Sequence, residues 1–510
     1  MTRIWRVAAA AAAALTLAGC TSVGATAGGG SGGPVDELKM GTFLDVTAWD
    51  PANADIGFDG PYLSAVYDPL VNLDEDSEPV PGLATDWTYS DDLRTLTMNL
   101  RSGVTFDDGE KFDAPAAVKN VEHLMAGTRS GQAYLNVAGV DAVDADTIRI
   151  HLNKRDDTLL YFMGLGRSWM ASPAAIDAGT LDDGPVGSGP YTYDTSRSTP
   201  GSQYVFTKKP GHWDAATFPF PTVRMFPITD QTASFNAMLS GQLNVQYANP
   251  TNIAQAQQNG WTVTHGVATW VGLQFVDRTG QHLKPLGDVR VRRAISYAFD
   301  GAGVLKAVNG NIDDPAGTVT NQLFPAGRAV HDPALDNRYA HDLAKARQLM
   351  AEAGHPGGFP VTMPMSQTFQ TWQPAVEQTL GQLGITVTWE DMSMPDYQKN
   401  AATYPMFIAV IAMDSNAMAT VTDQITSQQW YNPEPSVDAF PEVRALVDQL
   451  GTATGDRQAA LLEQLNATLV DLAWEDVWYQ ADNTFFSVPG ITVTPVTGMM
   501  FPTLRFIQRG

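Results

Sequence analysis

The chain has 510 residues, of which 44% are hydrophobic and 17% are charged, so it is long enough for two or three domains with substantial cores. It carries 55 Asp and Glu against 31 Lys and Arg, which gives a formal net charge of −24 at pH 7. A surface this acidic repels phosphate backbones and excludes nucleic acid as a partner. The single cysteine, Cys20, excludes an internal disulfide, so the fold must depend on its hydrophobic cores.

Residues 1–19 have the pattern of a secretory signal peptide. Two arginines precede an apolar run of mostly Ala and Leu that is about half as long as the roughly 20 residues of a spanning helix. The run ends in Leu17-Ala18-Gly19-Cys20, which resembles the bacterial lipobox, where the Cys is acylated and becomes the first mature residue. This resemblance implies a lipid anchor at Cys20 that holds the protein at the outer face of the cell membrane. Residues 20–35, rich in Gly, are expected to form a flexible tether.

Strand and helix patterns follow one another from about Leu38 onward. Alternating Leu96, Met98 and Leu100, followed by Gly and Asp turn residues, predict a hairpin within 86–109. Asp113 is expected to cap a helix, because Pro115 lies in the first turn and apolar residues follow at helical spacing.

Later segments repeat this alternation. A second strand is predicted at 147–152, and the Gly- and Pro-rich residues 183–193 predict a loop that enters a strand. Helices are predicted at 288–300, 342–354 and 458–474. Since strands and helices are interleaved, the fold class is mixed α and β.

The sequence lacks the motifs that catalysis would require. There is no GxSxG nucleophile turn, no HExxH zinc motif and no Walker A phosphate loop. Gly28, Gly30 and Gly33 match GxGxxG, but the strand and helix of a dinucleotide site are not predicted around them. We therefore expect no catalytic residue, no metal and no cofactor, and we expect that the protein is not an enzyme.

Six segments, in order, are similar to the family 5 solute-binding proteins of ABC importers, which include oligopeptide- and dipeptide-binding proteins. The likeness extends over roughly residues 38–490. Asn244 and Met406 depart from it, because the family often has Asp at these places. The six segments are Val80–Trp87, Leu100–Gly109, Pro185–Tyr191, Met238–Gly241, Asp288–Ala294 and Ala344–Gly354.

The resemblance implies a two-lobed periplasmic-binding-protein-like fold whose lobes close over a ligand. Lobe one would comprise residues 36–268, with an extra subdomain at 76–185. Lobe two would comprise 269–485, and residues 486–510 would return to lobe one. A hinge is expected near Trp270, Gly272 and Phe275.

The resemblance also implies candidate ligand residues. In peptide-binding members an Asp of lobe two, after a hydrophobic strand, pairs with the ligand's α-ammonium. Asp414 lies at the matching position, and the resemblance makes Ser415 and Asn416, which follow it, candidate ligand residues as well. Asp414, Ser415 and Asn416 are also good helix caps, so a structural role is an equal alternative. Four aromatic residues lie in segments that resemble cleft-lining ones, although each could instead belong to a core: Phe58, Trp372, Trp430 and Tyr431.

The resulting hypothesis is a monomeric, lipid-anchored binding protein that captures a peptide-like solute and delivers it to an ABC permease. Ile411 replaces the family's usual Trp, and no Arg lies between residues 348 and 443 to bind a peptide carboxylate. An oligosaccharide, an opine or a nickel complex therefore stays open as the solute. Two other classes are a lipid-anchored hydrolase and a sensor or adhesion lipoprotein that keeps the fold.

Overall fold

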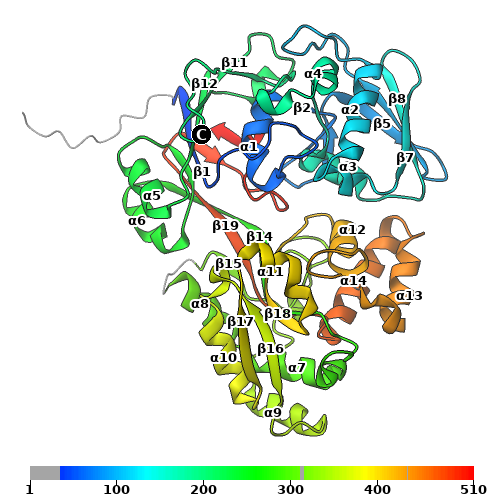
Figure 1. Ribbon diagram of the computed structural model, residues 1–510, viewed down its shortest axis with the longest axis vertical. Coiled ribbons are helices and arrows are strands. Elements are labelled where there is room, and N and C mark those ends of the chain that lie inside the picture. The colour runs from blue at the N-terminus through cyan, green and yellow to red at the C-terminus, as the bar shows by residue number, and fades with distance from the viewer. Residues whose placement is uncertain (1–34, 311–314, 434) are drawn as a thin grey trace, which may run out of the picture. The chain divides into compact units, whose positions relative to one another are not determined.

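Helices and strands alternate along the whole described chain, as the mixed α and β class requires (Figure 1). The computed structural model describes residues 35–310, 315–433 and 435–510. Cys20 and the tether lie outside these residues. Within them, no helix is both long and apolar enough to cross a bilayer.

A nine-stranded sheet forms the centre of the described chain. Strand β1 pairs in parallel with both β12 and β13, whereas β13, β19, β14 and β18 pair antiparallel in that order. The short strand β15 (Gly317–Thr318) also pairs with β19. The order across the sheet is β10 (Tyr191–Tyr193), β11 (Tyr204–Lys208), β12 (Thr222–Pro227), β1 (Glu37–Thr42), β13 (Val245–Tyr247), β19 (Asp476–Ser487), β14 (Thr262–Phe275) and β18 (Met406–Ala412).

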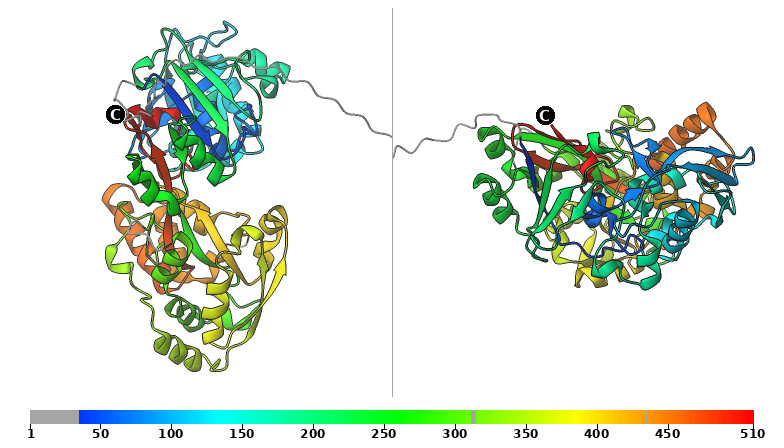
Figure 2. Two further views of the ribbon diagram at one scale, coloured as in Figure 1. Left: turned by 90° about the vertical axis from the view of Figure 1, so that its left-hand side faces the viewer. Right: turned by 90° about the horizontal axis from the view of Figure 1, so that it is seen from above.

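Two long strands of this sheet, β14 and β19, run from one half of the described chain into the other (Figures 1 and 2). Their register shifts between Val267 and Thr269, and again between Val271 and Gly272. Before the first shift β14 pairs only with β19, and after it β14 also pairs with β18. The first irregularity therefore separates the two parts of the ladder, because a bulge bends a strand at the extra residue.

The core on one side of this irregularity gathers buried side chains from Trp270 to Tyr479. It includes the parallel pair β16 (Pro360–Met365) and β17 (Thr386–Asp391), which α10 (Gln373–Gln382) connects. The other helices that bury side chains there include α7 (Val289–Ala298), α9 (Leu343–Glu352), α13 (Pro441–Leu450) and α14 (Gly455–Asp471).

The core on the other side joins residues from both ends of the described chain. Leu38 and Met40 of β1 are buried together with Phe485, Ile491 and Ile507. The last strands, β20 (Ile491–Val493) and β21 (Ile507–Arg509), pair antiparallel with each other. The division at residues 268 and 485 stays a prediction, although the buried side chains group in this way.

A separate four-stranded antiparallel sheet lies within the segment predicted as the extra subdomain. Its order is β5 (Ala84–Tyr89), β6 (Thr95–Leu100), β8 (Thr147–Leu152) and β7 (Val137–Ala142), and α2 (Ala114–Ala126) packs beside it.

The predicted hairpin and helix in this segment are confirmed, but the turn of the hairpin lies before the predicted strand and not after it. The turn of the β5–β6 hairpin precedes Leu96, at Ser90–Arg94, whereas the turn at Asp107–Gly109 closes a single bridge between Thr105 and Lys111. Asp113 caps α2, as expected, by accepting the backbone N–H of Ala116 at 3.0 Å.

The three predicted later helices are present as α7, α9 and α14, and the first two begin at the predicted caps. Asp288 and Asp342 accept backbone N–H groups at the starts of α7 and α9, and Gly354 follows α9 with a φ of +86°. Such a φ favours glycine, since a Cβ is poorly tolerated there.

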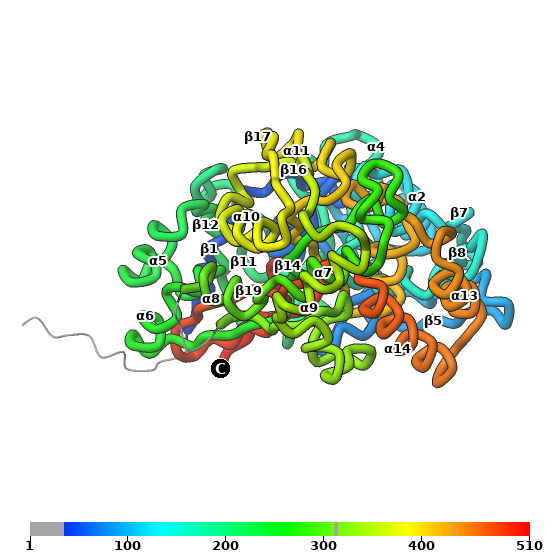
Figure 3. Tube along the Cα trace, turned by 90° about the horizontal axis from the view of Figure 1, so that it is seen from below, coloured from blue at the N-terminus to red at the C-terminus, as the bar shows by residue number. Residues whose placement is uncertain are grey.

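In the view from below, α13 and α14 lie on the same side of the molecule as β5, β7 and β8 (Figure 3). Arg155, just after β8, donates to the carbonyl of Ala453 at 2.7 Å, and Gln458 of α14 donates to Asp157 at 3.0 Å. The subdomain is thus tied to the segment between α13 and α14 by polar contacts.

Candidate functional site

The candidate site begins where the buried strand β18 ends. Residues 413–416 turn the chain into the short helix α12 (Ala417–Thr420), which continues as a π-helical turn, η10 (Val421–Thr426). Asn416 caps α12, since its side chain accepts the N–H of Ala419 at 3.0 Å. The cap that Asp414 could have supplied is therefore filled by Asn416, and the Asp414 carboxylate is left for other contacts.

Asp414 meets a tyrosine from a distant part of the chain. Tyr161, in α3 (Leu159–Phe162), donates its hydroxyl to Asp414 Oδ1 at 3.3 Å, and the same hydroxyl oxygen accepts the N–H of Ser415 at 3.1 Å. Tyr161 is buried in a small cluster with Ala419 of α12 and Met499. This contact joins the two halves of the described chain directly at Asp414.

A second carboxylate, Asp423, belongs to η10. Burial raises the pKa of Asp423 to about 6, and its side chain accepts one hydrogen bond, from Gln429 Nε2 at 3.3 Å. Burial also raises the pKa of Asp414 well above its usual range, and the nearby charge of Asp423 raises it further. Among the described residues, neither carboxylate forms an ion pair with a Lys, Arg or His.

Gln424 and two aromatic side chains hold η10 against the end of β18. Gln424 accepts from Trp270 Nε1 at 3.3 Å and donates to the carbonyl of Ala412 at 3.2 Å. Tyr431 donates its hydroxyl to the carbonyl of Asp423 at 3.1 Å. Burial raises the pKa of Tyr431 well above its usual range. π-Helical turns are frequent at functional sites, and this one positions Asp423.

The predicted aromatic residues divide into two groups. Trp430 is 37% exposed and stacks on Phe407 with ring centroids 6.0 Å apart. Trp430 also contacts the ring of Tyr431, and these two residues lie on the segment that follows Asp423. Trp372 lies elsewhere in the larger core and donates to the Tyr479 hydroxyl at 2.9 Å.

Phe58 packs in the other core, with ring centroids 6.4 Å from Phe43 and 6.2 Å from Phe501. In the part of the chain that the structure describes, no hydrogen bond or ring contact joins Phe58 or Trp372 to Asp414. Their role as ligand residues stays a prediction.

The three predicted hinge residues lie on β14, beyond its first irregularity. Trp270 and Phe275 are fully buried, and a Cβ on Gly272 would approach the carbonyl oxygen of Asp476 to 1.9 Å. They are packed against β18 and β19, whereas the bulge at residue 268 lies just before them.

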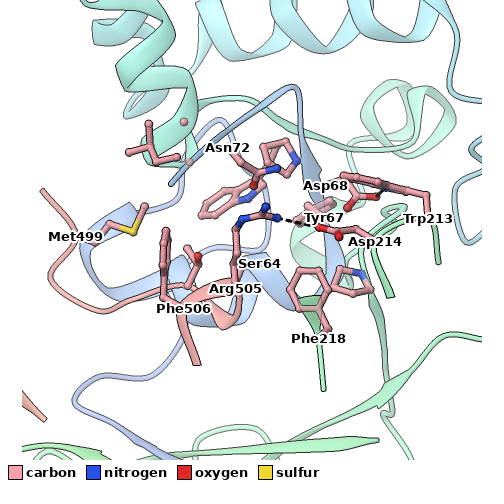
Figure 4. A pocket seen from close by; sticks show the side chains of 17 residues that line it. Ser64, Tyr67, Asp68, Asn72, Trp213, Asp214, Phe218, Met499, Arg505 and Phe506 are labelled. Carbon is pink, nitrogen blue, oxygen red and sulfur yellow. Dashed lines mark hydrogen bonds and ion pairs between the residues drawn. The ribbon is translucent and has the colours of Figure 1, made fainter. Parts of the chain in front are cut away.

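Asp414 lines neither of two cavities in the described part of the chain. The first is lined by Tyr67, Asp68, Met499 and Arg505 among others, and Arg505 forms an ion pair with Asp214 at 2.8 Å (Figure 4). The second lies beside Asp476. Neither is lined by a residue that sequence reasoning proposed for ligand binding. No group of three or more His, Cys, Asp or Glu side chains among the described residues could hold a metal ion.

Sequence reasoning missed Tyr161, Asp423 and Gln424. Tyr161 lies 253 residues from Asp414, and no local pattern joins them. Asp423 could have been noticed as an acid shortly after Asp414, but the return of its segment to the end of β18 could not have been foreseen.

Comparison with known proteins gives one family. The model for "Bacterial extracellular solute-binding proteins, family 5 Middle" matches residues 78–433. The glutathione-binding protein GsiB of Escherichia coli O1:K1 is 24% identical over 457 residues, which cover 86% of this chain and 87% of that protein. GsiB of Salmonella paratyphi A is 28% identical over 352 residues, which cover 66% of each chain.

Solved structures share the fold. NikA of Brucella suis, in complex with Fe(III)-EDTA, has a TM-score of 0.78 at 19% identity. The superposition covers 93% of this chain and 100% of the NikA chain. DppA of Helicobacter pylori, in complex with the peptide STSA, has a TM-score of 0.75 at 19% identity and covers 93% of this chain and 98% of its own. The predicted two-lobed periplasmic-binding-protein fold is confirmed.

Proposed function

We propose, on the premise that the chain belongs to the bacterial extracellular solute-binding proteins of family 5, that it captures a small peptide-like solute between its lobes and delivers it to an ABC permease. Proteins of this family are extracytoplasmic and bind solutes for ABC importers. The identity of the solute, its binding residues and the lipid anchor at Cys20 are parts of the proposal.

The observation that carries the proposal is the position of Asp414 and its lack of a charged partner among the described residues. Its carboxylate follows a buried strand, caps no helix and has no cationic partner among the described residues. Asp414 is partly buried, and withdrawing a carboxylate from water is costly unless a cation or several donors compensate it. An amine on the solute would supply that compensation through a charge-assisted hydrogen bond.

The contact between Tyr161 and Asp414 suggests how binding is coupled to lobe closure. The tyrosine and the carboxylate come from opposite sides of the β14 irregularity, and the hydroxyl of Tyr161 also contacts Ser415. A solute amine that binds Asp414 would favour the arrangement in which this contact forms. A ligand shifts such an equilibrium only by its differential affinity for the two states.

The lipid anchor completes the proposed role. An acylated Cys20 with the Gly-rich tether at 20–35 would keep an acidic domain near the permease, although its own surface would be repelled by anionic lipid.

Native mass spectrometry of the purified protein, followed by denaturation to release any carried ligand, tests the proposal. A ladder of peptide masses is the expected result. A single non-peptide mass, such as an opine or an oligosaccharide, would keep the transport role and overturn the peptide assignment. If no ligand is carried, a thermal-shift screen compares free and N-acetylated peptides, and an equal response to both would refute the role assigned to Asp414.

A further inference from the structure

Among the described residues, Asp414 is not the only carboxylate at the proposed site without a compensating charge. Asp423 follows nine residues later, where α12 and η10 fold back onto the end of β18. Gln424 bonds to the carbonyl of Ala412, which places the neighbouring Asp423 beside the turn that carries Asp414. The two carboxylates are close enough for the charge of Asp423 to raise the pKa of Asp414.

Both carboxylates have few hydrogen-bond partners among the described residues. Asp414 accepts one long bond from Tyr161, and Asp423 accepts one from Gln429, at 3.3 Å in both cases. Carboxylates with a structural task in this chain are bound more fully. Asp277, for example, accepts backbone N–H groups from Gln281, His282 and Leu283.

The charge balance of the pair limits the ligands that satisfy it. A ligand with one ammonium group compensates one carboxylate and leaves the other either charged and unpaired or protonated. Two partly buried like charges repel each other, so a ligand with a single ammonium group leaves one carboxylate without a charge-assisted bond. A ligand with two positive groups compensates both.

The surroundings also favour a cation at Asp423. Trp430, seven residues further on, is the partly exposed aromatic ring of this segment, and an indole face attracts ammonium and guanidinium groups. No Arg lies between residues 348 and 443 in the sequence to repel such a group, and among the described residues Lys399 of α11 (Met394–Asn400) forms no hydrogen bond or ion pair with either acid.

We propose that Asp414 and Asp423 act as a pair and select a solute with two positive charges, namely a short peptide-like molecule with a free α-ammonium and a basic first side chain. This inference rests on the proposed function, because it places the ligand at Asp414. It adds Asp423 as the residue that determines specificity for the first side chain.

Calorimetry with two tripeptides tests the pair. Lys-Ala-Ala and norleucyl-Ala-Ala have side chains of similar length, and only the first carries a second positive charge. We expect the parent protein to bind the lysyl peptide at least about tenfold more tightly, as for one hydrogen bond between charged groups. In Asp423→Asn the preference should fall to within about threefold, since asparagine still accepts from Gln429 but carries no charge.

Asp391→Asn is the matched control. It removes the same charge from an exposed position at the end of β17, so the preference for the lysyl peptide should persist. Equal affinity for both tripeptides in the parent protein, or an unchanged preference in Asp423→Asn, would overturn the inference. This comparison in the parent protein holds whether or not a variant folds.

Cadaverine and pentylamine separate this inference from the proposed function. If cadaverine binds more tightly than pentylamine but neither tripeptide binds, the dication site stands and the peptide function fails. If the tripeptides bind equally, the peptide function stands and the pairing of Asp414 with Asp423 fails. If none of the four compounds binds, both fail.

Discussion

Replacement of Asp414 by Asn is expected to separate ligand binding from structural support. The substitution keeps the size of the side chain and an oxygen that can accept from Tyr161. It removes the negative charge, so binding of an amine-bearing solute should weaken by about 1.5–3 kcal/mol, the usual value of a hydrogen bond to a charged group. This corresponds to a rise in Kd of roughly 10- to 150-fold.

The stability of the free protein should respond in the opposite sense. Burial and the charge of Asp423 raise the pKa of Asp414, so its ionised form costs free energy in the folded state. The neutral amide avoids this cost. We therefore expect the Asp414→Asn protein to melt at the same temperature as the parent or higher when no ligand is bound.

Asn416→Ala is the matched control, because it lies two residues away and removes the cap of α12. Loss of a cap costs about 0.5–2 kcal/mol of stability. We expect a lower melting temperature for Asn416→Ala and a smaller change in its Kd than in Asp414→Asn. Calorimetry with the ligand recovered by mass spectrometry, together with thermal melts, measures both quantities.

Two outcomes would refute this reasoning. Equal ligand affinity in Asp414→Asn and the parent protein would remove Asp414 from the binding site. A loss of stability in Asp414→Asn as large as that in Asn416→Ala would show that the carboxylate supports the fold instead.

Three further predictions concern the fold and the anchor. Burial raises the pKa of Asp476 from 3.8 to about 7, so the native state binds an extra proton between about pH 4 and 7 and loses stability as the pH rises through that window. Asp476→Asn should therefore flatten the dependence of Tm on pH. An unchanged slope of Tm against pH would contradict this prediction. Gly272→Ala should lower the free energy of unfolding by about 1–3 kcal/mol, because its Cβ would lie 1.9 Å from a backbone oxygen. Gly139→Ala should leave the free energy of unfolding unchanged, because a Cβ at Gly139 would have no other atom within 4 Å. Equal free energies of unfolding in denaturant for the two variants would disprove the steric argument. Cys20→Ser should move the protein from the membrane fraction to the soluble fraction, and retention of the variant in the membrane would rule out acylation as the anchor.

Local signals allowed much of the fold to be predicted from the sequence. The predicted caps at Asp113, Asp288 and Asp342 are confirmed, and they were predictable because each carboxylate accepts a backbone N–H only two or three residues away. The strand at 147–152 was likewise correct, since its side chains alternate between the core and water.

The choice between Asp414 and Asn416 as the cap could not be made in this way. Asp414, Ser415 and Asn416 are all capping types, and the one that acts depends on where the chain leaves β18 and turns into α12. That point is set by the packing of β18 against β14, which lies more than a hundred residues earlier.

The sequence alone predicts the family resemblance, the mixed α and β class, the capped helices and Asp414 as a candidate for ligand binding. The tertiary structure was needed to join Tyr161 to Asp414, to place the partly buried Asp423 near it and to leave both carboxylates without a cation among the described residues. The physical reason is that capping and alternation act over a few residues of chain. Burial, and with it the pKa of a carboxylate, depends on segments that meet only when the chain has folded.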